Sequence, residues 1–135
     1  MAAAPFDWFG YFRLANELGK RLDDEASLRS AISRAYYYVY HLALARAEMN
    51  TYKRTPGEAS HTQLWRVFSL NPEPDCQRLA EIAKRLKEKR ERADYERRYA
   101  RISEEISAIL AEAQDFATLL GRLPKRHPNP RSMRE

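Results

Sequence analysis

The sequence predicts an all-α protein that folds as a compact bundle of four to five helices. Apolar residues recur at helical spacing along almost the whole chain, and no alternating run bounded by turn residues predicts a strand. The 135 residues include only four glycines, and they are enough for one domain with a real core. We therefore place a single helical bundle at residues 1–121.

The first part of the chain predicts two helices. The first begins after Pro5, has Asp7 as a candidate cap, and ends at about Leu22. The second spans residues 24–50, and the acidic residues in its first turn suit the positive end of the helix dipole. Residues 51–57 contain Thr-Pro-Gly, which favours a connection over a helix.

Three further helices are expected, at residues 60–70, 75–95 and 103–120. Gly121 is a natural stop for the last of them. Beyond it, residues 122–135 place three prolines among five basic residues and one acidic residue, so they account for most of the formal net charge of +5. Such a composition buries little apolar surface, and we expect this basic Pro-rich tail to be disordered.

The long second helix carries a polar stripe that is separate from its apolar face. At about 100° per residue, the two sets of side chains point in different directions. The polar stripe contains Ser30, Arg34, Tyr38, His41 and Ala45, and the apolar face contains Leu28, Ala31, Ile32, Ala35, Val39 and Leu42. An arginine, a tyrosine and a histidine on one side of a helix make this stripe the first candidate for a functional site.

Cysteine and histidine usage indicates where the chain works and what it binds. The single cysteine, Cys76, rules out an internal disulfide. The N-terminal residues show neither a secretory signal nor an apolar run long enough to span a membrane, so we expect a cytoplasmic protein. The histidines lack the paired spacing of a zinc site, and no glycine-rich phosphate loop is present. We therefore expect no metal or other cofactor.

Several segments, in the same order along the chain, resemble the HEPN superfamily of small helical domains. The first is Ala-Ile-Ser-Arg-Ala-Tyr-Tyr at residues 31–37, followed by His41. The second is Arg-Glu-Arg-Ala-Asp-Tyr at residues 90–95, which leads into the last helix. Between them, Ser-His-Thr at residues 60–62, ahead of Phe68, resembles the third helix of the stand-alone, toxin-like prokaryotic branch.

The resemblance covers about residues 8–122 and implies a helical bundle that usually dimerises. Many members of the superfamily are metal-independent endoribonucleases, and others are inactive. The nuclease signature is an arginine followed after four to six residues by a histidine, normally on a late helix. Here no histidine follows Arg90 or Arg92 on the late helix, and Arg34 and His41, on the second helix, have the required spacing.

Metal-free RNA cleavage needs a base for the 2′-hydroxyl, an acid for the leaving oxygen and a cation for the phosphorane. In the nuclease interpretation, Arg34 holds the scissile phosphate and His41 is the general acid or base. The two residues lie about 10 Å apart along the helix axis, so a phosphate has to lie between them. Tyr37 and Tyr38 offer rings on which an RNA base can stack.

The same residues also fit a structural interpretation. Arg34 then pairs with a carboxylate such as Asp94, and His41 lies in a dimer seam. Asp94 and Tyr95 hold the bundle together at a helix end, and His61 either caps the third helix or faces the same cleft as a second titrating group.

The expected fourth helix carries a basic run that is interrupted by Glu88 and Glu91. The run consists of Lys84, Arg85, Lys87, Lys89, Arg90 and Arg92. It is either a solvated face laced with Glu-to-Lys pairs or a ridge that binds a nucleic-acid backbone, with Arg90 and Arg92 as the RNA-binding residues.

Two classes of function follow from the resemblance. In the first, the chain is a HEPN-type ribonuclease, the toxin of a toxin and antitoxin pair or a component of antiviral defence, with a minimal nucleotidyltransferase as partner and a homodimer completing the site. In the second, it is a non-catalytic HEPN domain that binds RNA, a nucleotide or a protein partner. The absence of a histidine after Arg90 on the late helix favours the second class.

Overall fold

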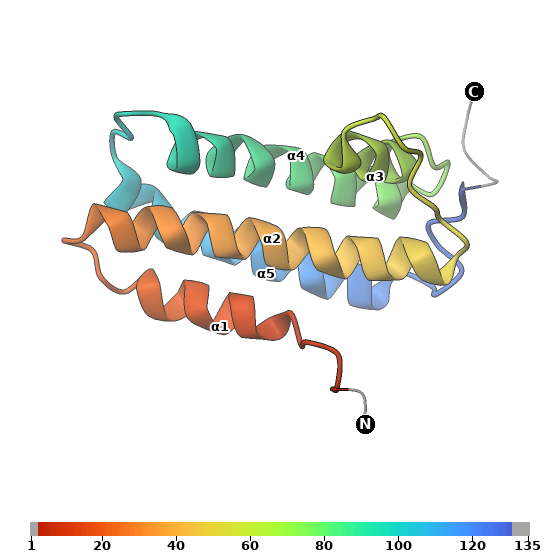
Figure 1. The fold of residues 1–135 in the computed structure, drawn as a ribbon, viewed down its shortest axis with the longest axis horizontal. Coiled ribbons are helices and arrows are strands. Elements are labelled where there is room, and N and C mark those ends of the chain that lie inside the picture. The colour runs from red at the N-terminus through yellow and green to blue at the C-terminus, as the bar shows by residue number, and fades with distance from the viewer. Residues whose placement is uncertain (1–2, 131–135) are drawn as a thin grey trace.

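Five α-helices follow one another along the described part of the chain, in the order that the sequence predicts (Figure 1). The computed structural model describes residues 3–130. The helices are α1 Phe9–Leu18, α2 Glu25–Met49, α3 Ser60–Ser69, α4 Pro74–Tyr95 and α5 Ile102–Arg122. No strand occurs among the described residues, so the predicted all-α class is confirmed. None of these helices combines the length and the apolar character needed to cross a membrane.

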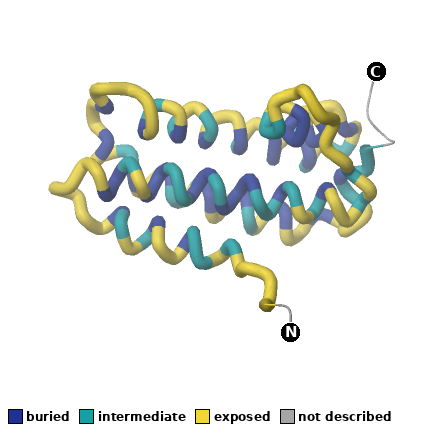
Figure 2. The backbone as a smooth tube through the Cα atoms, in the orientation of Figure 1, coloured by how far each residue is buried: buried dark blue, intermediate teal, exposed yellow. Residues whose placement is uncertain are grey.

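α2 is the central helix of the bundle. It packs against α1, α4 and α5, whereas α3 packs chiefly against α4. In Figure 1, α1 and α4 run along opposite sides of α2, and α5 lies behind it. Buried positions therefore occur along the whole length of α2, while α1 buries only the side that includes Phe12 and Ala15 (Figure 2).

A ridge of small residues on α2 lets its neighbours approach closely. Every fourth position from 31 to 47 is alanine or valine, and each of these side chains is 0% exposed: Ala31, Ala35, Val39, Ala43 and Ala47. Side chains four residues apart form the ridges along which helices interdigitate. Larger buried side chains fill the remaining space, and each contributes about 1.5–3 kcal/mol by leaving water: Leu28, Ile32, Tyr36, Leu64, Phe68, Leu79, Leu86 and Phe116.

Two arginines of α2 hold the carboxyl ends of α4 and α5. Arg29 Nη1 donates to the Ala93 carbonyl at 2.9 Å. Arg46 donates from Nη2 to the Leu120 carbonyl at 2.9 Å and from Nη1 to the Leu123 carbonyl at 3.1 Å. The last carbonyls of a helix lack partners within the helix and carry partial negative charge. These two arginines therefore fix the ends of both helices relative to α2.

The helical bundle extends further along the chain than the sequence predicts. α5 continues through Gly121, the expected stop, because it is Leu123 that precedes a proline and takes an extended conformation. Residues 123–130, which the sequence assigns to the tail, pack against the bundle through the buried Leu123 and Pro128. The remainder of the expected tail, residues 131–135, lies outside the described residues.

Candidate functional site

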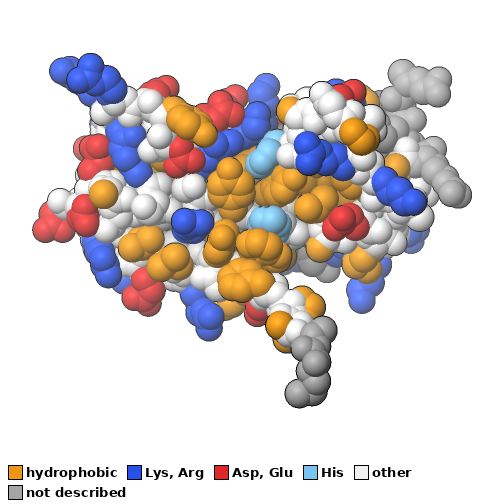
Figure 3. All heavy atoms as spheres, viewed as in Figure 1, with side chains coloured by type: hydrophobic (Ala, Val, Ile, Leu, Met, Phe, Trp, Pro, Cys, Tyr) orange, Lys and Arg blue, Asp and Glu red, His pale blue; other side chains and the backbone are white. Residues whose placement is uncertain are grey.

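Candidate site residues gather on one side of α2, beside α3 and α4. Figure 3 shows two histidine side chains close together on this side of the molecule, with hydrophobic side chains around them. The Tyr40 ring joins them, because its centroid lies 5.3 Å from that of His41 and 4.1 Å from that of His61. We call this surface the histidine face, and it consists of Arg34, Tyr37, Tyr40, His41, His61 and Arg90.

His41 lies against the residue that precedes α1. Its ring stacks on Trp8, with centroids 3.4 Å apart and planes 5° from parallel. Asp7 Oδ1 accepts from the backbone N–H of Phe9 at 3.0 Å, which fixes the start of α1 next to Trp8. Burial lowers the pKa of His41, so the imidazole is neutral at pH 7. Because its ring makes no hydrogen bond within residues 3–130, a nitrogen lone pair is free to accept a proton.

Arg34 joins the same face through an aromatic ring of α1. Its guanidinium carbon lies 4.9 Å from the Tyr11 ring centroid, and the Tyr11 ring lies 5.1 Å from that of Trp8. Arg34 and His41 therefore rest on two neighbouring rings, in keeping with the stripe that the sequence predicts. The half-buried guanidinium forms no hydrogen bond or ion pair with any described residue, so its donors remain available to a ligand.

A buried chain of hydrogen bonds holds His61, in the first turn of α3. Trp65 Nε1 donates to the Tyr36 hydroxyl oxygen at 3.1 Å, and that oxygen lies 2.6 Å from His61 Nδ1. The indole N–H can only donate, so the Tyr36 hydroxyl oxygen accepts from Trp65. The Tyr36 side chain is buried, and His61 Nδ1 is the one acceptor for its O–H in the described part of the chain, so this proton is satisfied when the hydroxyl donates to His61 Nδ1. Burial, followed by the charge of Arg90, lowers the pKa of His61 to about 4. The ring is therefore neutral at pH 7, with its proton on Nε2.

This arrangement decides between the two positions that the sequence left open for His61. The residue at the N-cap position of α3 is Ala59, and no side chain caps this helix. The His61 ring instead faces the rings of Tyr36, Tyr37 and Tyr40. His61 thus belongs to the same face as His41.

Arg90 is the most deeply buried arginine of the histidine face and is not part of an exposed basic ridge. Its side chain is 9% exposed, and its guanidinium carbon lies 5.3 Å from the Tyr36 centroid and 5.6 Å from that of Tyr37. Asp94 Oδ2 lies 3.6 Å from Arg90 Nη1, so Asp94 does not pair with Arg34 as the structural interpretation expects. The Arg90 Nε–H is buried and has no hydrogen-bond partner in the described part of the chain. Burying a cation with so few partners costs free energy, which marks Arg90 as a functional candidate.

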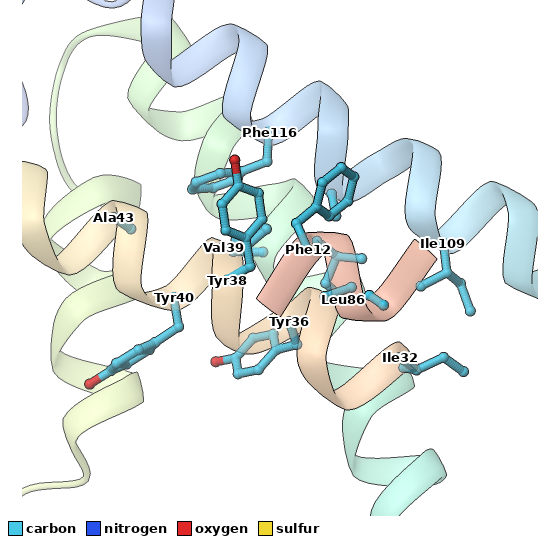
Figure 4. Close-up of a cluster of buried hydrophobic side chains, with 14 of the residues drawn as sticks. Phe12, Ile32, Tyr36, Tyr38, Val39, Tyr40, Ala43, Leu86, Ile109 and Phe116 are labelled. Carbon is cyan, nitrogen blue, oxygen red and sulfur yellow. The ribbon is translucent and has the colours of Figure 1, made fainter. Parts of the chain in front are cut away.

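The prediction that Tyr38 stacks on an RNA base is wrong. Tyr38 is 7% exposed, and its ring stacks on Phe12 of α1 with centroids 5.0 Å apart. Figure 4 shows the Tyr38 ring on the opposite side of α2 from the rings of Tyr36 and Tyr40. The polar stripe was assigned from helix geometry alone, and α1 covers the part of it that contains Tyr38. Tyr38 therefore belongs to the core.

The end of α4 has mainly structural contacts. Arg92 pairs with Glu96, with Nε and Oε2 3.5 Å apart, and its guanidinium carbon lies 4.3 Å from the Tyr99 centroid. Tyr95 is 77% exposed, and its ring centroid lies 6.0 Å from the Arg90 guanidinium carbon. Arg92 thus holds the chain that follows α4, while Tyr95 borders the histidine face.

Carboxylates accompany most of the basic run on α4. Some come from α4 itself and others from α5, so the run links the two helices. The pairs are Arg85 with Glu112 at 2.9 Å, Lys87 with Glu91 at 3.2 Å, and Lys89 with Glu105. Of the two interpretations that the sequence left open, these pairs favour a solvated, ion-paired face over a ridge that binds phosphates.

The aromatic residues that assemble the histidine face could not be identified from the sequence alone. Trp8 lies before α1 in a segment without periodicity, so no pattern places it on His41. Trp65 has the spacing of a core residue, which hides its hydrogen bond to Tyr36. One signal was present for Tyr40, because residues three apart on a helix share a face and Tyr37 precedes it at that spacing.

In comparisons with known proteins, no family model matches the chain, and no curated protein and no solved structure matches it significantly. The HEPN resemblance therefore stays an interpretation of the motifs at residues 31–37 and 90–95.

Proposed function

We propose that the protein is a metal-independent endoribonuclease that binds single-stranded RNA on the histidine face. The observation that carries the proposal is the Tyr40 ring between two neutral histidines, His41 and His61, on a face that also holds two arginines. Arg34 lies on the Tyr11 ring, which neighbours the Trp8 ring under His41, and the charge of Arg90 acts on His61. Cations that hold phosphates and rings that stack on bases are the usual means of binding single-stranded RNA.

In this proposal the residues divide the chemistry among them. His41 takes the proton of the 2′-hydroxyl. Its lowered pKa keeps the ring neutral at pH 7, and its ring nitrogens make no hydrogen bond within residues 3–130. Arg34 neutralises the phosphate that the 2′-oxygen attacks, through its fixed fork of donors. As the bond from the 2′-oxygen to phosphorus forms, the bond from phosphorus to the 5′-oxygen breaks, and the leaving oxygen takes its proton from water. The half-buried Tyr37 offers a ring for an adjacent base.

A specific observation supports the second class of function, binding without cleavage. The pKa values of both His41 and His61 are lowered, so neither imidazole carries the proton that a general acid would give to the leaving oxygen at pH 7. A non-catalytic HEPN-like domain that binds RNA, a nucleotide or a protein partner uses the same cationic and aromatic groups and needs no acid.

The biological setting of the proposal comes from the resemblance. It comprises a toxin and antitoxin pair or antiviral defence, a minimal nucleotidyltransferase as partner, a homodimer that completes the site, and a cytoplasmic location. These stay predictions.

Incubation of the purified protein with cellular RNA in excess chelator tests the proposal. We expect cleavage by the unaltered protein and its loss in Arg34→Ala and in His41→Ala. His127→Ala is the matched control, because His127 lies near Glu73, with Nε2 and Oε2 4.0 Å apart, and makes no contact with the histidine face. Cleavage that survives both substitutions contradicts the assigned site. RNA binding without cleavage by any form supports the non-catalytic class.

A further inference from the structure

Arg90 has far fewer partners than a buried guanidinium needs. The group has five N–H donors. Asp94 Oδ2, 3.6 Å from Nη1, is the one carboxylate paired with it in the described part of the chain, and that distance is longer than a hydrogen bond. The Nε–H is buried against aromatic rings without an acceptor. The terminal nitrogens are therefore left to meet an acceptor that comes from outside the chain.

His61 presents a donor beside this cation. The proton of the Tyr36 hydroxyl occupies His61 Nδ1, so the ring proton lies on Nε2, and Trp65 fixes the Tyr36 hydroxyl in turn. A neutral imidazole in this tautomer donates from Nε2 and takes up no proton at Nδ1 while Tyr36 is in place. His61 therefore differs from His41, whose ring has no such partner in residues 3–130.

The two groups share their surroundings. Arg90 and His61 both lie against the rings of Tyr36 and Tyr37. Arg90 and Lys87 both lower the pKa of His61 through their charge, and this effect exceeds that of the nearby carboxylate Glu91. Two cations thus act on the His61 ring, and nearby positive charge favours the binding of an anion.

We propose that His61 and Arg90 form a subsite for a single phosphate group, with His61 donating from Nε2 and Arg90 donating from its terminal nitrogens. Tyr36 and Trp65 are positioning residues that keep His61 in the donating tautomer. The inference deepens the proposed function and rests on it for identifying this phosphate as one in the RNA backbone, next to the phosphate held by Arg34.

Nuclear magnetic resonance of the full chain, labelled with 15N at its three histidines, tests the subsite. Before any addition, we expect His61 in the Nε2–H tautomer at pH 7. Inorganic phosphate should then shift the His61 signals to saturation and leave those of His127 unmoved. Chloride at equal ionic strength separates binding from screening.

Two variants separate positioning from binding. Tyr36→Phe frees His61 Nδ1, so we expect the Nδ1–H tautomer to gain population and the Kd for phosphate to rise about tenfold. Arg90→Gln removes the cation, so we expect the Kd to rise at least about tenfold with the tautomer unchanged. Arg78→Gln is the control, since Arg78 is an exposed arginine of α4 whose partner is Asp75. Helicity confirms that each variant is folded.

Different failures lead to different conclusions. An Nδ1-protonated His61 in the unaltered protein, or equal shifts of His61 and His127 on adding phosphate, overturns the subsite. If RNA is cleaved but phosphate leaves His61 unmoved, the subsite falls and the nuclease proposal stands. If phosphate binds as expected but no RNA is cleaved, the nuclease proposal falls and the subsite stands.

Discussion

Arg29 and Arg46, near the two ends of α2, differ from Arg34 and Arg90, on the histidine face, in what surrounds their guanidinium groups. Arg29 donates to the Glu96 carbonyl at 2.6 Å as well as to other carbonyls at the end of α4, and Arg46 donates to three carbonyls at and beyond the end of α5. Arg34 and Arg90 lie against aromatic rings, and neither donates a hydrogen bond to a described residue.

This difference separates arginines that stabilise the fold from arginines that are open to a ligand. A cation surrounded by backbone carbonyls has its hydrogen bonds satisfied within the chain, so a phosphate would have to displace them. A cation on ring faces keeps its donors and gains about 0.5–2 kcal/mol from the rings. The arginines of the histidine face therefore keep donors for a ligand, whereas the donors of Arg29 and Arg46 are occupied by backbone carbonyls.

The largest expected effect is on stability, at the end of α5. Arg46→Met removes the charged hydrogen bonds to the carbonyls of Leu120 and Leu123 but keeps the aliphatic stem. We expect the free energy of unfolding to fall by about 3 kcal/mol, because hydrogen bonds to charged groups contribute about 1.5–3 kcal/mol each and are not additive. Urea denaturation measures this change. A loss under about 1 kcal/mol would show that the carbonyls find water instead.

The same substitution on the histidine face, Arg34→Met, should reduce RNA cleavage strongly and stability only slightly. Arg34→Met removes a contact with the Tyr11 ring but leaves no hydrogen-bond acceptor unpaired within residues 3–130. We therefore expect the free energy of unfolding to fall by about 1 kcal/mol or less. Cleavage of RNA should fall at least about tenfold, since a charged contact to the phosphate is lost. Measuring stability and cleavage for Arg34→Met and Arg46→Met together tests the comparison. Equal losses of stability in the two variants would contradict it.

Most of the fold could be predicted because it depends on local patterns. The expected bounds of the second to fourth helices lie within a residue or two of α2, α3 and α4, since acidic first turns and proline-rich connections mark their ends. Gly121 shows the limit of such signals. A glycine favours a helix end but does not impose one. Pro124 does end α5, because the residue before a proline, Leu123, is pushed into an extended conformation.

The site could be predicted only in part, because its assembly depends on long-range packing. Helix geometry placed Arg34 and His41 on one side of α2, and both rest on rings of the α1 region. The same geometry grouped Tyr38 with them, since a periodicity gives a direction but not the helix that covers it. The partners of His61 come from residues far apart in the sequence, and no spacing rule links Trp65 to Tyr36.

His61, on the histidine face, should make the stability of the protein depend on pH. The pKa of His61 is about 4 in the folded chain and about 6.5 when unfolded, so between these values the unfolded state binds more protons. Its contribution to stability is fully present above pH 6.5 and is lost progressively as the pH falls towards 4. We expect urea denaturation between pH 7.5 and pH 5 to show a smaller drop for His61→Gln than for the unaltered protein.

The matched control for this prediction is Thr62→Gln, which introduces the same side chain at the next, exposed position of α3 and removes no titratable group, so its drop should equal that of the unaltered protein. Carboxylates whose pKa values are lowered, such as those of Asp24 and Glu105, lose their contribution below this range, so they do not obscure the comparison. An equal drop in His61→Gln and in the unaltered protein would show that His61 accepts a proton in the folded state without cost.

The smallest expected effect is the pH dependence of RNA cleavage, and it tests the division of roles between His41 and His61. A base has to be neutral, and burial holds the pKa of His41 below its ordinary value of 6.5. The rate should therefore be flat above about pH 7 and should fall by no more than about tenfold at pH 5.5. Because Tyr36 keeps His61 in one neutral tautomer, Tyr36→Phe should alter the affinity for RNA but leave this profile in place. A rate that keeps rising above pH 7.5 would assign the base to a group other than His41.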